Sequence, residues 1–124
     1  MLAITAMLLT TGCYKVATYA PPDTGTAVTT TVSFEKDMQP ILTKNCAISG
    51  CHASGGQKPN LSDGSAFNSL SGGGYLSKSK PESSIVYERL IGKLVPAMPF
   101  GAKSNPSNLN GLMLAWIKQG AKNN

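Results

Sequence analysis

Apolar residues recur at helical spacing in two separate parts of the chain. The first set comprises Phe34, Met38, Ile41 and Leu42, and the second comprises Leu109, Leu112, Met113, Trp116 and Ile117. Spacings of three and four residues place the members of each set on one face of a helix. The sequence therefore predicts two amphipathic helices, and we expect their apolar faces to pack against each other.

Capping and breaking residues mark the limits of these helices. Ser33 is suited to cap the first helix, and Pro40 should kink or restart it because proline lacks a backbone N–H. The last helix is expected to begin at Asn105 and Pro106 and to run to Gly120. Two shorter helices are expected between them, over residues 63–70 and 81–91.

The N-terminal 32 residues have a different composition. Residues 1–12 are uncharged and mostly apolar, and they are too few to span a bilayer, which takes about 20 residues. We interpret them as a signal peptide for export. Residues 13–32 are rich in Thr, Ala and Pro and predict a flexible tether, so the folded domain is expected to comprise residues 33–124.

A cysteine closes the apolar N-terminal run. Thr11-Gly12-Cys13 resembles the end of a bacterial lipoprotein signal, in which Cys13 would carry the lipid. Two features depart from that pattern: Leu9 lies one place further from Cys13 than is usual, and no basic residue precedes the apolar run. The alternative is a plain signal peptide with an incidental cysteine.

The charged residues of the chain indicate which classes of partner the protein could bind. The net charge of +5 indicates a mild preference for acidic partners. Arg89 is the only arginine, and no run of Lys or Arg occurs, so nucleic acid is not expected as a partner.

The candidate chemistry lies in the segment from Cys46 to His52. Two cysteines followed at once by a histidine are typical of covalent haem attachment, in which the thiols add to the vinyl groups and the imidazole binds iron. The usual motif has two residues between the cysteines, whereas this segment has four. Ser49-Gly50 supplies a flexible turn that would let the first thiol reach its vinyl group. With 13 glycines and few aromatic residues, the protein has a thin apolar core that a buried porphyrin would supplement.

Three other interpretations of this segment remain open. Cys46 and Cys51 could form a disulfide in an exported protein. A structural zinc ion would need four ligands, and the chain has no second cluster of Cys or His. A Cys–His catalytic pair is less well matched, because such partners are neighbours in space rather than in sequence.

Two residues outside the motif complete the predicted site. The carbonyl of Pro59 or of its neighbour could accept a hydrogen bond from the second ring nitrogen of His52, which fixes a metal-binding histidine. Met98 lies in a loop between Pro96 and Pro99, outside any helical stripe, which suits a thioether held as the sixth iron ligand. Met38 and Met113 lie within the helical stripes and are expected to be buried.

Taken together, residues 34–121 resemble a small monohaem c-type cytochrome of the bacterial cell envelope. The matching parts are the helix before the motif, Cys46/Cys51/His52, the Met98-Pro99 loop, and Trp116-Ile117 followed by Gly120-Ala121. The resemblance implies an all-α, cytochrome c-like fold in which the first and last helices cross and enclose one covalent haem c. It also implies His52 and Met98 as iron ligands and a periplasmic, lipid-anchored location.

Three functions are compatible with these residues. The first is electron transfer between redox partner proteins, with both axial positions filled and no catalytic residue; His52 is the only histidine, so bis-His ligation within the chain is excluded. The second is a haem enzyme or sensor with an open sixth position. The third is a haem-free surface lipoprotein, stapled by a disulfide, that binds a partner.

Overall fold

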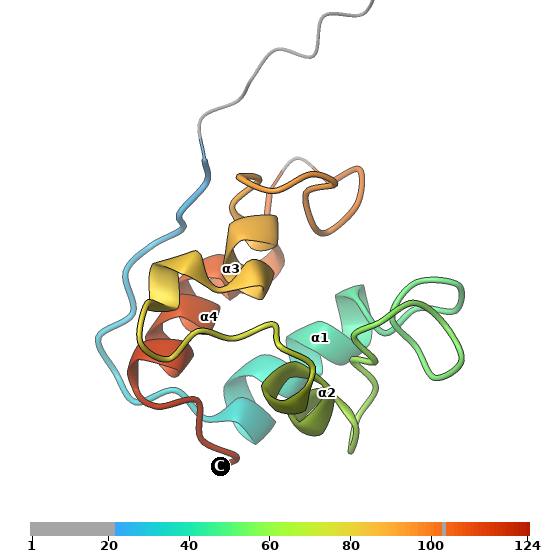
Figure 1. Cartoon of the computed structure of the whole chain (residues 1–124), viewed down its shortest axis with the longest axis horizontal. Coiled ribbons are helices and arrows are strands. Elements are labelled where there is room, and N and C mark those ends of the chain that lie inside the picture. Colours follow the sequence, from blue (N-terminus) through green and yellow to red (C-terminus); the bar gives the residue numbers. More distant parts are fainter. Residues whose placement is uncertain (1–21, 103) are drawn as a thin grey trace, which may run out of the picture.

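The computed structural model describes residues 22–102 and 104–124, and within these ranges the protein is helical and contains no β-strand. This confirms the all-α class (Figure 1). The predicted signal peptide and Cys13 lie outside the described residues. The α-helices are α1 (Gln39–Asn45), α2 (Ala66–Gly72), α3 (Ile85–Leu90) and α4 (Leu109–Lys118). Phe34–Met38 forms a π-helical turn, and Pro81–Ser83 and Pro106–Asn108 form 3₁₀ turns.

The first helix begins and restarts where the sequence predicted. Ser33 caps the π-helical turn, since its hydroxyl accepts from the Lys36 N–H at 3.1 Å and its own N–H donates to the Asp37 carboxylate at 2.7 Å. Helix α1 then begins with Pro40 in its first turn, where proline's missing N–H has no intrahelical partner to lose. It ends at Asn45, directly before Cys46.

An aromatic cluster joins the two ends of the domain. The Trp116 ring of α4 lies 5.0 Å from the Phe34 ring and 6.2 Å from the Phe67 ring of α2, measured between centroids. The predicted packing of the last helix against the first is therefore confirmed. Met38 and Met113, the two methionines of the helical stripes, are also fully buried. Other fully buried side chains are those of Leu70, Leu109 and Ile117.

Three helix limits differ from the sequence-based expectation. The predicted helix over residues 81–91 is broken at Ser84, whose buried hydroxyl accepts from the Ser77 N–H at 2.9 Å and whose backbone is extended. In the helix that follows the break, Tyr87 is buried and Ile85 is exposed. The regular turns of the last helix begin only at Leu109, because Ser107 and Asn108 have left-handed backbone conformations. Helix α2 begins at Ala66 rather than near residue 63.

The described part of the predicted tether, residues 22–32, is extended and runs beside α4 (Figure 1). The Asn108 side chain accepts from the Thr26 N–H and donates to the Thr26 carbonyl, both at 2.8 Å. The Gln119 side chain donates to the Thr30 carbonyl at 2.9 Å and accepts from the Val32 N–H at 2.8 Å. These residues were expected to be mobile. Instead, the side chains of Asn108 and Gln119, which flank α4, form hydrogen bonds with their backbone and join them to the helical unit.

Replacing Gly111 by Ala should displace this segment, because an added Cβ would lie only 2.2 Å from the Thr26 carbonyl oxygen. We expect the variant to lose about 1–3 kcal/mol of stability, as for other overpacked sites. The Thr26 N–H should exchange with solvent about tenfold faster. Gly72→Ala is the matched control, since nothing lies within 4 Å of its added Cβ. Equal Thr26 exchange in the two variants would show that the segment is not held at Gly111.

Candidate functional site

Cys46 is positioned by the end of α1. Its backbone N–H donates to the Leu42 carbonyl at 2.9 Å, as the last turn of the helix requires. Its side chain is half-buried and packs against the edge of the hydrophobic core. Cys51 is exposed, and both thiols are free. One of the two cysteines therefore has a fixed position at the core, while the other faces solvent.

The four residues between the cysteines form a compact loop. The Cys51 N–H donates to the Ile48 carbonyl at 2.9 Å, and the His52 N–H donates to the Cys46 carbonyl at 3.1 Å. Gly50 has a φ of 79°, a left-handed conformation that glycine adopts readily. The loop thus returns the chain to Cys46, so that the longer spacing still leaves His52 beside the first cysteine.

The His52 ring is oriented by the loop that follows it. Its Nδ1 atom lies 2.9 Å from the Pro59 carbonyl oxygen and 3.3 Å from the Gln57 carbonyl oxygen. A carbonyl oxygen only accepts, so Nδ1 carries the hydrogen and Nε2 keeps the lone pair that a metal needs. The loop is closed by the Leu61 N–H, which donates to the His52 carbonyl at 2.8 Å. This is the contact that the sequence analysis expected of Pro59 or its neighbour.

The environment of Cys46 suppresses its ionisation. Burial, and to a smaller extent repulsion by a charged Cys51, raise the pKa of the Cys46 thiol to about 11. Cys46 is therefore a neutral thiol at physiological pH.

Met98 lies in the loop between α3 and α4. Its side chain is half-buried and packs against the same core as Cys46. Its N–H donates to the Arg89 carbonyl at 2.9 Å, which fastens the loop to the end of α3. Met38 and Met113 are completely buried, so Met98 is the accessible methionine of the described residues.

Both loops of the candidate site expose large apolar side chains. In the part of the chain that the structure describes, Ile48 is 50% exposed, and Val95 and Phe100 are 82% and 81% exposed. In Figure 1 the loop after α3 lies above that helix, and the loop after α1 lies to the right of α1. These exposed side chains are available to contact an apolar group bound at the loops. Together with two thiols and an oriented imidazole, these residues fit a haem group.

Hydrogen bonds connect four of the predicted site residues with one another, but they do not connect these residues with Met98. Cys46, Cys51, His52 and Pro59 belong to one hydrogen-bonded loop system, as described above. Within residues 22–102 and 104–124, no hydrogen bond connects this system to the Met98 loop. The proximity of Met98 to His52 therefore stays a prediction.

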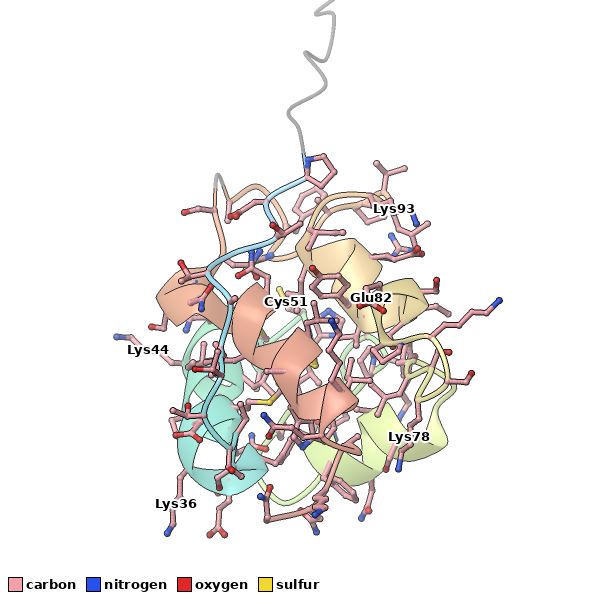
Figure 2. All side chains as sticks on the ribbon, turned by 90° about the vertical axis from the view of Figure 1, so that its left-hand side faces the viewer. Lys36, Lys44, Cys51, Lys78, Glu82 and Lys93 are labelled. Atoms are coloured by element: carbon pink, nitrogen blue, oxygen red, sulfur yellow. The ribbon has the colours of Figure 1, made fainter. Side chains whose placement is uncertain are left out.

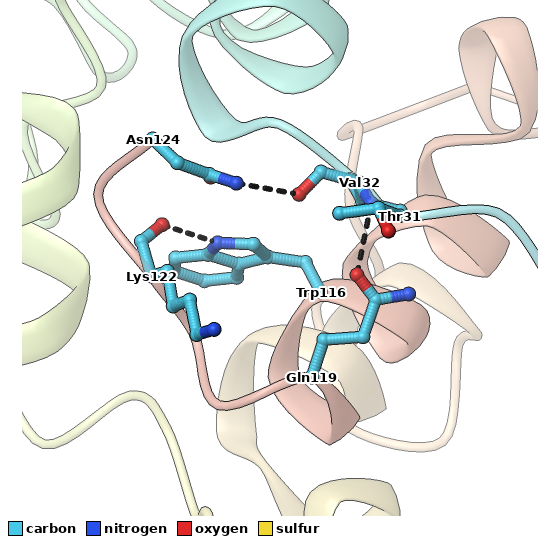
Figure 3. Close-up of a pocket in the computed structure, with 6 residues that line it drawn as sticks. All are labelled: Thr31, Val32, Trp116, Gln119, Lys122 and Asn124. Carbon is cyan, nitrogen blue, oxygen red and sulfur yellow. Dashed lines mark hydrogen bonds between the residues drawn. The ribbon is translucent and has the colours of Figure 1, made fainter.

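Two pockets lie elsewhere in the molecule. One, of about 290 Å³, is lined by residues 31–32 and by the end of the chain around Trp116 (Figure 3). Several of its polar groups are paired: Gln119 and Asn124 bind the Val32 backbone, and the Trp116 Nε1–H donates to the Lys122 carbonyl at 2.8 Å. The second, of about 250 Å³, lies between Phe34 and Phe67. Neither includes a predicted haem-binding residue.

The described residues contain no cluster of three or more His, Cys, Asp or Glu side chains that could hold a metal ion. Nor does any helix within them have the length and apolar character needed to cross a membrane. Comparison of the chain with models of protein families, with curated proteins and with solved structures found no match.

Arg89 is a residue of this site that the sequence analysis did not identify. Its side chain donates from Nη1 to the Pro96 carbonyl at 3.0 Å, two residues before Met98. The sequence offered one weak signal, namely that the only arginine lies at the end of the helix before the Met98 loop.

In the haem-free protein, we expect iodoacetamide to modify Cys51 faster than Cys46. At pH 8 only about one Cys46 thiol in a thousand is ionised, given its raised pKa of about 11, and the thiolate is the reactive form. The Cys46 rate should rise about tenfold per pH unit between pH 7 and 10. Tandem mass spectrometry of the peptide containing both cysteines measures each rate. A Cys46 rate that levels off below pH 9 would contradict the raised pKa.

Proposed function

We propose that residues 33–124 form a small monohaem c-type cytochrome that transfers electrons in the bacterial cell envelope. The proposal assigns covalent haem attachment to Cys46 and Cys51, and axial iron ligation to His52 and Met98. Pro59 orients His52 through its carbonyl. No residue is assigned a catalytic role.

The observation that carries this proposal is the 2.9 Å contact between the His52 Nδ1 atom and the Pro59 carbonyl oxygen. A histidine whose Nδ1–H donates to a backbone carbonyl presents its Nε2 lone pair to a metal, and this arrangement is typical of haem-ligating histidines. The two free thiols of the same loop support the proposal further, because a disulfide gives the histidine after Cys51 no role and a structural zinc ion would need more ligands than this loop supplies.

Each residue of the proposed site has a distinct task. A haem attached here supplies an iron that alternates between the ferrous and ferric states. Cys46, held at the end of α1 and protonated, offers an S–H bond for addition across a vinyl group. His52 is kept in one orientation by Pro59. Ile48, Val95 and Phe100 would cover apolar area of the porphyrin and exclude water from it.

Met98 favours a carrier over an enzyme or sensor with an open sixth position. It is partly buried at the core edge, in a loop fastened to α3, whereas Met38 and Met113 are committed to the core. A thioether opposite histidine raises the reduction potential relative to bis-His ligation.

The proposed partners are redox proteins with an acidic docking surface. Lys44 and Lys58 are exposed beside the Cys46–Pro59 loop system, and neither forms an ion pair in the described residues. Lys93 and Lys118 are instead paired with Glu88 and Glu82. Figure 2 shows that the labelled lysines lie at separate points of the surface rather than in one patch. Steering by Lys44 and Lys58 would therefore be local and sensitive to salt.

The haem is expected to remain on the polypeptide after denaturation and extraction with acidified acetone, because thioether bonds survive this treatment. Mass spectrometry should find the mass of the processed chain plus one haem. In a Cys46→Ser/Cys51→Ser variant, any haem should extract completely. A wild-type polypeptide that is two hydrogens lighter and carries no haem would instead indicate the disulfide-stapled alternative.

Met98→Ala should abolish the weak near-infrared charge-transfer band of a ferric His/Met haem and lower the reduction potential, because the thioether is lost. Met113→Ala is the matched control. It should cost about 2–5 kcal/mol of stability, since Met113 is fully buried, and leave the band in place. If the band persists in Met98→Ala or is absent from the wild type, the iron is open or differently ligated.

Cys13→Ser should release the mature protein from the membrane fraction into the soluble envelope fraction, because the lipid proposed on Cys13 provides the anchor. Cys51→Ser should not change this distribution, because Cys51 belongs to the haem site. A wild-type protein that is already soluble after processing would contradict the anchor and leave the haem proposal untouched.

A further inference from the structure

The end of α3 fastens the Met98 loop at several points. The last carbonyls of a helix have no intrahelical partner and are free to accept other hydrogen bonds. Here the Glu88 carbonyl accepts from the N–H groups of Lys93 and Leu94, at 2.9 and 3.1 Å. The Leu90 carbonyl accepts from the Asn105 side chain at 2.5 Å. The two ends of the loop are thus bound to neighbouring carbonyls of one helix.

Arg89 contacts the middle of this loop in two ways. Its carbonyl accepts from the Met98 N–H at 2.9 Å, and its guanidinium donates to the Pro96 carbonyl at 3.0 Å. The Arg89 backbone thus binds Met98 itself, and the Arg89 side chain binds Pro96, two residues earlier. Proline has no N–H, so Pro96 offers only its carbonyl for such a contact, and a cationic donor makes the stronger hydrogen bond.

We propose that Arg89 is a positioning residue for Met98, which holds the loop so that the thioether stays in place as an iron ligand. This inference rests on the proposed function. An iron–thioether bond is weak, so ligation depends on how often the loop moves away from the core. By bridging α3 and Pro96, the guanidinium lowers the population of the open loop.

Three variants separate this role from a general effect of charge. Arg89→Met keeps the aliphatic stem and removes the donor. Arg89→Lys keeps the charge and one donor that can reach toward Pro96. Lys93→Met also removes one positive charge, four residues further along the chain, and Lys93 pairs with Glu88 rather than with a loop carbonyl. Thermal melts of all three check that each variant folds.

The population of the open loop is measured by titrating the ferric holoprotein with imidazole, which binds iron only when Met98 has left. The apparent affinity scales with the fraction of open loop. We expect Arg89→Met to bind imidazole about three- to tenfold more tightly than the wild type, which corresponds to the loss of one solvent-exposed hydrogen bond. Arg89→Lys and Lys93→Met should stay within about twofold of the wild type. Amide exchange at Met98 should accelerate in Arg89→Met alone.

Equal imidazole affinity and Met98 exchange in Arg89→Met and the wild type would overturn the inference and leave Met98 ligation standing. Equal shifts in Arg89→Met and Lys93→Met would also overturn it, because charge alone would then be the cause. If imidazole binds the wild type without loss of the near-infrared band, or if that band is never present, Met98 is not the ligand, and the inference falls together with the proposed ligation.

Discussion

The burial of Trp116 is the interaction on which the rest of the structure depends. Its ring is 1% exposed and touches Phe34 from the start of the domain and Phe67 from α2. A buried indole also needs a partner for its N–H, and the chain supplies the Lys122 carbonyl by turning back after α4 at Ala121. That turn brings the last residues against residues 32–35, so one side chain joins both ends of the domain.

The candidate site is built outward from this core. Helix α1 follows directly after Phe34–Met38 and delivers Cys46 at its C-terminal end, and α3 delivers the Met98 loop. Both loops are held internally by backbone hydrogen bonds, while their large apolar side chains face solvent. Each loop therefore combines backbone anchoring with apolar side chains that remain exposed.

Backbone groups do most of the positioning at this site. A carbonyl sets the tautomer of His52, another closes the Cys46–His52 loop, and a third holds the N–H of Met98. In the electron carrier proposed above, ligands held in this way would stay in place in both oxidation states and so reduce the reorganisation that accompanies electron transfer. Side chains contribute at fewer points, of which the Arg89 guanidinium is the clearest.

The sequence by itself determined the features that depend on near neighbours. The helical stripes, the Ser33 cap, the restart at Pro40 and the burial of Met38 and Met113 follow from spacing and residue type, and so does the adjacency of Cys51 and His52. Only the tertiary structure decided the break at Ser84, the late start of α4, the attachment of residues 22–32 and the contact of Arg89 with Pro96. Each of these features involves hydrogen bonds or contacts between residues that the spacing of apolar positions along the chain does not relate to one another. Polar side chains such as Asn108 and Gln119 pair with whatever backbone the folded core brings to them, and no periodicity in the sequence records that choice.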